Sequence, residues 1–129
     1  IESPWHQKAY LVLKNLLEGN EPLAIPWQCL REFYSVVSNP RIYKPATPSN
    51  HCLEQIEAWL ESPCLEIISE EENYKSHFLK ILRECHIQGA LVHDAHIAAL
   101  CIAKGFNTIY TQDRDFSRFK GLTVVNPLI

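Results

Sequence analysis

The 129-residue chain has no methionine, and no two of its cysteines stand at the C-x-x-C spacing of zinc and redox sites. Its five cysteines are odd in number and widely spaced, which favours free thiols in a reducing compartment. No apolar run approaches the roughly 18 residues that span a bilayer, and no basic start with an apolar stretch indicates a secretory signal. We therefore expect a cytoplasmic protein without disulfides.

Positive charge is not in excess either, because the formal net charge is −3 at pH 7. A protein that binds nucleic acid chiefly by neutralising phosphates is usually basic. Any contact with nucleic acid must therefore be local or carried by a metal ion. The length and the apolar content of 47% fit one globular domain with a real core.

Helical and strand patterns alternate along the chain. Short apolar runs predict strands over residues 23–25, 64–68, 106–110 and 122–125. Apolar spacing, caps and breakers predict five helices: from Ser3-Pro4 to Gly19, from residue 27 to about 38, from a Ser49 or Asn50 cap to Pro63, from the acidic residues 70–72 through Cys85, and from 91 to Gly105. Such alternation predicts an α/β fold with a parallel sheet covered on both faces, and a ligand site beyond the carboxyl ends of the strands.

The predicted helix over residues 27–38 has a mixed composition. Its wheel assigns the core face to Trp27, Leu30, Phe33, Tyr34 and Val37. Glu32 falls at the border of that face, so periodicity alone predicts a solvated surface residue there.

Asp94 is the one carboxylate in the predicted helix over residues 91–104, which is apolar or small nearly all round. A helix of this kind is buried on most sides, and a charge near its start is costly unless something pairs with it. Asp94 shares a face with the small residues Ala98 and Cys101. It either complements the helix N-terminus or belongs to a functional site, and the pattern leaves both readings open.

Asp113 and Asp115 directly follow a predicted strand, which places them at the rim where ligands bind. They form either a polar turn or, with Asp94, a crevice of carboxylates that a cation must neutralise. All-oxygen ligation suits Mg²⁺ or Mn²⁺ better than Zn²⁺. His93 and His96 lack a further Cys or His nearby, so packing or hydrogen bonding explains them better than zinc. Nearby cations are candidates to hold phosphates, although at least one of them is better explained by solvation: Arg114, Arg118 and Lys120.

Three segments taken together resemble the PIN-domain ribonucleases, specifically the VapC-type toxins of bacterial toxin–antitoxin modules. They are PWQCLREF at residues 26–33, LVHDAHIAA at 91–99 and TQDRDF at 111–116, and the shorter NPR at 39–41 and NPL at 126–128 add to the likeness. The resemblance extends over essentially the whole chain. It implies a PIN-like three-layer α/β/α fold with a central, mainly parallel sheet.

The resemblance also implies a four-acid site that binds Mg²⁺ or Mn²⁺. Glu32 matches the second acid, against the wheel argument, Asp94 the third and Asp113 the fourth, while Asp115 is an additional ligand or water-positioning group. Thr111 matches the hydroxyl residue beside the fourth acid. The activity implied is metal-dependent endonucleolytic cleavage of structured RNA, with a cognate antitoxin as inhibitor and a homodimer as the common assembly.

The first acid of the family, an aspartate on the first strand, has no counterpart, because Glu2 does not match its position. We therefore expect residues 1–129 to form a single PIN-like domain lacking its first strand, with about ten further N-terminal residues in the natural protein. Without that strand its neighbours would leave backbone groups unpaired.

Two other classes of function compete with the nuclease. One is a catalytically inactive PIN-like module that serves only as a protein partner, which the missing acid and the negative charge support. The other is a receiver-like phospho-acceptor domain, but the acidic pair after the first strand and the lysine near the last strand that it needs are not visible.

Overall fold

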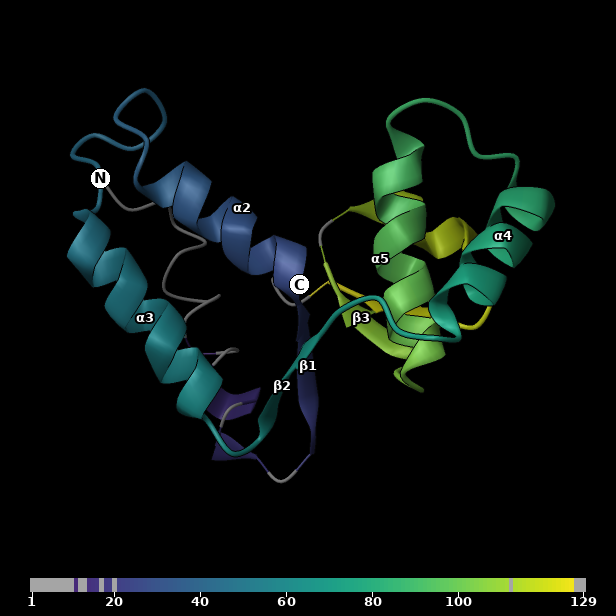
Figure 1. Ribbon diagram of the computed structural model, residues 1–129, viewed down its shortest axis with the longest axis horizontal. Helices are drawn as coiled ribbons and strands as arrows, with labels where there is room; N and C mark the ends of the chain where they lie inside the picture. Colours follow the sequence, from purple (N-terminus) through teal and green to yellow (C-terminus); the bar gives the residue numbers. More distant parts are fainter. Residues whose placement is uncertain (1–10, 12–13, 17, 20, 112, 127–129) are drawn as a thin grey trace. The chain divides into compact units, whose positions relative to one another are not determined.

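The computed structural model describes residues 11, 14–16, 18–19, 21–111 and 113–126 (Figure 1). By their internal contacts they divide into two compact units, residues 17–69 and residues 1–16 with 70–129. Each unit contains one two-stranded parallel sheet, β1 with β2 and β3 with β4. The predicted α/β class with parallel strands is confirmed, and in the described part of the chain the strands form two pairs.

The unit of residues 17–69 is a strand–helix–helix–strand arrangement. It consists of β1 (Leu23–Pro26), α2 (Trp27–Val37), α3 (Ser49–Glu61) and β2 (Leu65–Ile68). The sheet register pairs Leu23 with Leu65 and Pro26 with Ile68. Leu30, Cys52 and Ile68 form its buried core. Phe33 and Trp59 join the two helices edge to face, with ring centroids 4.9 Å apart.

Two expectations for this unit were wrong. Trp27 and Tyr34 are 46% and 37% exposed, because α2 packs chiefly on α3 and β1 and only a narrow stripe around Leu30 is covered. The third helix has no Ser or Asn cap. Pro48 precedes it, and the Pro48 carbonyl accepts the first backbone hydrogen bonds.

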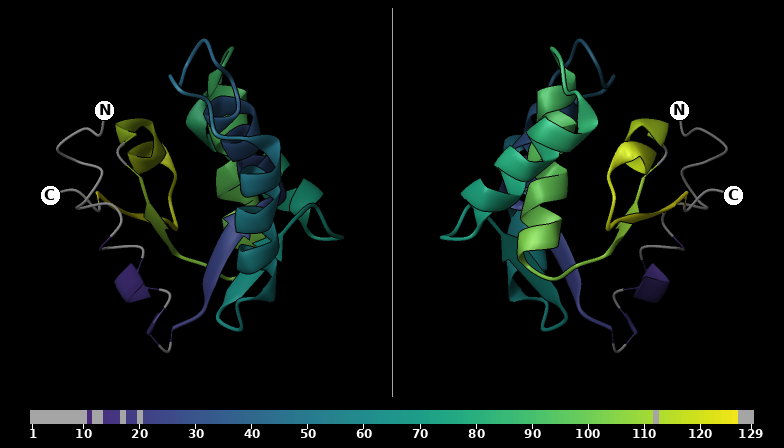
Figure 2. Two further views of the ribbon diagram at one scale, coloured as in Figure 1. Left: turned by 90° about the vertical axis from the view of Figure 1, so that its left-hand side faces the viewer. Right: turned by 90° about the vertical axis from the view of Figure 1, so that its right-hand side faces the viewer.

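The unit of residues 70–129 begins with two helices that lie side by side, α4 (Tyr74–Cys85) and α5 (Leu91–Ala103) (Figures 1 and 2). Tyr74 and Ile81 give α4 a buried side, and α5 buries residues 95 and 98–101, most of them small. Gly105 has a φ of +83°, so it ends α5 in the left-handed conformation that glycine adopts at little cost.

The rest of this unit follows α5 as β3 (Thr108–Tyr110), the 3₁₀-helix η1 (Arg114–Arg118) and β4 (Thr123–Val125). β3 and β4 are parallel, with Thr108 opposite Thr123 and Tyr110 opposite Val125. Both strands are shorter than the predicted runs. The 3₁₀-helix η1 begins a few residues after the carboxyl end of β3. The acidic residues were expected at this edge of the sheet.

The acidic residues 70–72 precede the fourth helix instead of forming its first turn. α4 begins at Tyr74, and no acidic residue lies in its first turn. Glu71 instead pairs with Lys104, and the Asn73 amide donates to the Ala103 carbonyl at 2.8 Å. These contacts join the segment before α4 to the end of α5.

The first predicted helix is only partly described. Residues 11, 14–16 and 18 are helical, whereas the predicted start at Ser3-Pro4 lies outside the described residues. No helix in the described ranges is long and apolar enough to cross a membrane.

Candidate active site

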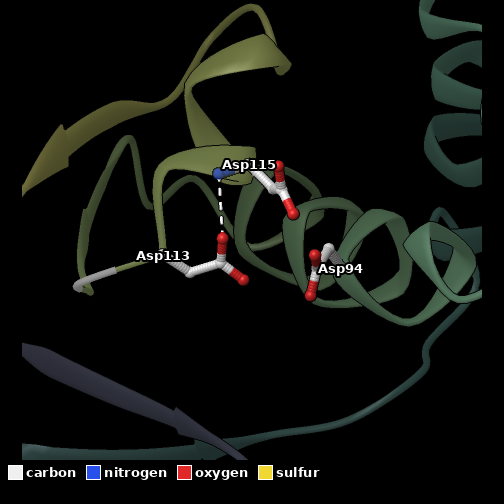
Figure 3. A group of neighbouring side chains, drawn as sticks. All are labelled: Asp94, Asp113 and Asp115. Atoms are coloured by element: carbon white, nitrogen blue, oxygen red, sulfur yellow. Dashed lines mark hydrogen bonds between the residues drawn. The ribbon is translucent and has the colours of Figure 1, made fainter.

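Asp94 lies in the first turn of α5 and is partly exposed. The helix begins after Ala90 without a side-chain cap, so Asp94 does not act as the N-cap. On the same face, Ala98 and Cys101 are buried. These small side chains leave room for a neighbouring element to approach this face of the helix. The Asp94 carboxylate, at the end of the face, is directed toward Asp113 and Asp115 (Figure 3).

Asp113 and Asp115 are held by hydrogen bonds within their own segment. The Asp113 backbone N–H donates to the Thr111 hydroxyl at 3.0 Å, and the Asp115 N–H donates to Asp113 Oδ1 at 2.9 Å (Figure 3). Threonine and aspartate commonly form such bonds two residues along the chain. Asp113 thereby caps η1, so the polar-turn reading is confirmed for this residue. Buried Phe116 and Phe119 fix η1 to the core.

The three aspartates nonetheless converge. Each offers a carboxylate oxygen, and these oxygens all lie within 4.8 Å of one another (Figure 3). They are also the only three aspartates in the sequence. Burial raises the pKa of Asp94, and the negative charges of Asp113 and Asp115 raise it further. The polar turn and the convergence of the three carboxylates therefore occur together, and the cation that the second interpretation adds stays a prediction.

Three carboxylates that repel one another suit a cation. The donor set is all oxygen, which matches Mg²⁺ or Mn²⁺ and lacks the sulfur or nitrogen ligands typical of zinc. In the described part of the chain, no other group of three such side chains converges in this way. His96 is hydrogen-bonded to the Tyr74 hydroxyl and faces Glu70, as the packing interpretation predicted, and His93 is exposed.

The predicted site residues fall into two groups. Asp94, Asp113 and Asp115 come together, with Thr111 supporting the loop. Glu32 is an exposed residue of α2 in the unit of residues 17–69. Its assignment to the site stays a prediction.

One contact of the site was not foreseen. The side chain of Arg118, at the end of η1, donates to both the backbone carbonyl and the carboxylate of Asp115. The spacing of three residues between an acid and an arginine was the available signal, because such pairs are neighbours on one helix face.

Comparison with known proteins identifies the family of the chain. The PIN domain family model matches residues 6–122. The chain therefore belongs to the PIN domain family. Among its relatives, Ribonuclease VapC48 of Mycobacterium tuberculosis is 27% identical over 125 residues, which are 97% of this chain and 86% of the relative. Ribonuclease VapC43 of the same species is 28% identical over 117 residues, which are 91% of this chain and 79% of the relative.

A solved structure supports the fold. A chain of VapBC2 from Rickettsia felis, bound to a DNA fragment from its promoter, matches with a TM-score of 0.66 and 22% identity. The match covers 93% of this chain and 85% of that chain. The predicted resemblance to VapC-type PIN proteins is confirmed.

Proposed function

We propose that this protein is a metal-dependent endoribonuclease toxin of the VapC type. The observation that carries the proposal is the convergence of all three aspartates of the chain at the end of β3. The relatives that match nearly the whole chain are named ribonucleases, which supports the same activity.

Asp94, Asp113 and Asp115 hold Mg²⁺ or Mn²⁺ in this proposal. When bound, such an ion lowers the pKa of water and stabilises negative charge that develops on a phosphodiester. The chain's own contribution is to fix the carboxylates. Thr111 and Asp113 hold the loop by the two backbone hydrogen bonds, and α5 presents Asp94 opposite to it.

A cognate antitoxin is the proposed partner, because the solved relative is the VapBC2 complex. The predicted homodimer and cytoplasmic location are part of the same proposal and follow from the family alone. A PIN-like first strand that contributes the first acid also stays a prediction.

The assay that tests the proposal is cleavage of total RNA by the protein expressed from its own gene. We expect cleavage with Mg²⁺ or Mn²⁺ and none with EDTA, because three unneutralised carboxylates repel a phosphodiester. Cleavage that persists in EDTA would contradict the metal site. A protein that binds Mn²⁺ but cuts no RNA would instead support the inactive binding module.

Glu32 is proposed as a further acid of the site on the family resemblance. Replacing Glu32 by Gln is expected to lower the cleavage rate by at least about tenfold, the smaller end of the loss that follows removal of a metal-site partner. Thermal unfolding is expected to stay nearly unchanged, because Glu32 is exposed. Glu57→Gln, an exposed acid on α3, is the matched control. Equal rates for the two variants would remove Glu32 from the site.

A further inference from the structure

We propose that Arg118 binds a phosphate of the RNA substrate directly beside the three aspartates. This inference rests on the proposed function, since it assigns a substrate contact to the same site. It concerns a residue that is not an acid and that the metal site itself does not need.

The guanidinium of Arg118 is held along one edge. Its Nε–H donates to the Asp115 carbonyl at 3.2 Å, and its Nη2 donates to Asp115 Oδ1 at 3.4 Å. The other edge, formed by the hydrogens of Nη1 and the second hydrogen of Nη2, has no hydrogen-bond partner among the described residues. That edge is a planar fork, which matches two oxygens of a phosphate. The side chain is 39% exposed, so the fork is open to solvent.

The base of the side chain is also fixed. The Arg118 carbonyl accepts a hydrogen bond from the Cys85 thiol at the end of α4, with 3.8 Å between sulfur and oxygen. On either side in sequence, Phe116 and Phe119 are buried. An arginine held at both ends loses little conformational freedom when a ligand binds, so binding costs less entropy.

The local charge gives this arginine its importance. The net charge of the chain is −3, and three carboxylates stand where the phosphodiester must approach. Arg118 is hydrogen-bonded to the carboxylate of Asp115, one of these three groups. Arg118 is therefore a positive charge directly at the cluster. It can supply the local phosphate contact that an acidic protein needs in order to bind nucleic acid.

Arg114 provides a matched comparison. It begins the same 3₁₀-helix, carries the same charge and is exposed. Unlike Arg118, it makes no hydrogen bond or ion pair with a described residue. A positive charge on η1 is therefore not enough to define the proposed contact, which also requires the hydrogen bonds to Asp115.

The test compares Arg118→Gln, Arg118→Lys and Arg114→Gln on an RNA that the natural protein cuts. We expect Arg118→Gln to raise KM by about tenfold or more, as the loss of a hydrogen bond to a charged group implies. The slope of log KM against log salt is expected to fall by about one, the signature of one lost phosphate contact. Arg118→Lys retains the charge without the fork, so it should restore the salt slope but only part of KM.

Two measurements separate this role from a structural one. Arg114→Gln should change KM by less than about twofold, because an exposed, unpaired charge contributes little. Mn²⁺ affinity without RNA should be retained in Arg118→Gln. Loss of Mn²⁺ binding with an unchanged salt slope would show that Arg118 only positions Asp115, and equal KM values for the two Gln variants would also overturn the proposal. If the natural protein cuts no RNA, the proposed function fails first, and this inference fails with it.

Discussion

Replacing Asp94 by Asn is expected to lower metal-dependent RNA cleavage by more than roughly 100-fold, the upper range for loss of a mere outer partner of a metal site. Asp94 is the one carboxylate that reaches the cluster from α5, so without it the proposed metal site would lose its ligand opposite the loop. Initial rates with Mn²⁺ measure the effect. Glu84→Gln, an exposed acid on α4, is the control and should retain full activity.

The same variant should be more stable than the natural protein when metal is absent. Burial and the neighbouring aspartates raise the pKa of Asp94, so in the folded state its charged form is disfavoured relative to the unfolded chain. The ionised carboxylate therefore destabilises the fold at neutral pH, and this effect disappears as the pH falls below its ordinary pKa. We expect a higher Tm for Asp94→Asn in EDTA at pH 7 and no difference in acid.

Adding Mn²⁺ should reverse that order. A ligand that binds only the folded protein stabilises it by about 2.7 kcal/mol at 100 times its Kd. The natural protein should gain Tm on titration, whereas Asp94→Asn should gain little. A natural protein whose Tm ignores Mn²⁺, or an Asp94→Asn variant that cuts RNA at the natural rate, would contradict the site.

Replacing Phe119 by Ala is expected to cost about 3–5 kcal/mol of unfolding free energy, the usual range for truncating a buried phenylalanine. Phe119 is 1% exposed and contacts Phe116 edge to face, with ring centroids 5.9 Å apart. For a chain of this size the Tm should fall by roughly 10 °C or more. Mn²⁺ affinity should fall as well, because the two aromatic side chains hold η1 in place.

Thermal and urea unfolding measure this second effect. Leu79→Ala is the matched control, because Leu79 is 47% exposed on α4 and its truncation should cost far less. Phe119→Leu keeps an apolar side chain and should fall between the two. If Phe119→Ala unfolded no more easily than Leu79→Ala, the ring would not anchor η1.

Local patterns predicted the elements of this protein well. Glycine and proline positions gave the limits of α2 and α5 to within about a residue, and strand order placed Asp113 and Asp115 at the rim. Periodicity predicted burial least well where the neighbouring elements decide which side chains are covered. The wheel of α2 assigned Trp27 to the core, but how much of a helix face is covered depends on its neighbours, which the wheel does not contain.

The sequence predicted only part of the candidate site, again because packing decides the rest. Whether Asp94 meets Asp113 depends on how α5 packs against η1, so the sequence left open whether Asp94 complements the helix N-terminus or belongs to a functional site. The shortage of aspartate elsewhere in the chain was a usable signal, because every one of them enters the cluster. For the acidic residues before α4 the sequence signal misled. Glu71 was expected to begin the helix, but it lies before α4 and pairs with Lys104 at the end of α5.

The hydrogen bonds from Thr111 through Asp113 and Asp115 to Arg118 have one more consequence. Each of these bonds joins residues two or three apart in sequence, so the spacings between Thr111, Asp113, Asp115 and Arg118 are set locally. A displacement of η1 would therefore carry the carboxylates of Asp113 and Asp115 and the guanidinium of Arg118 together. Asp94 belongs to α5 and has no part in this chain of bonds, so its distance from the other two carboxylates depends on how α5 packs against η1.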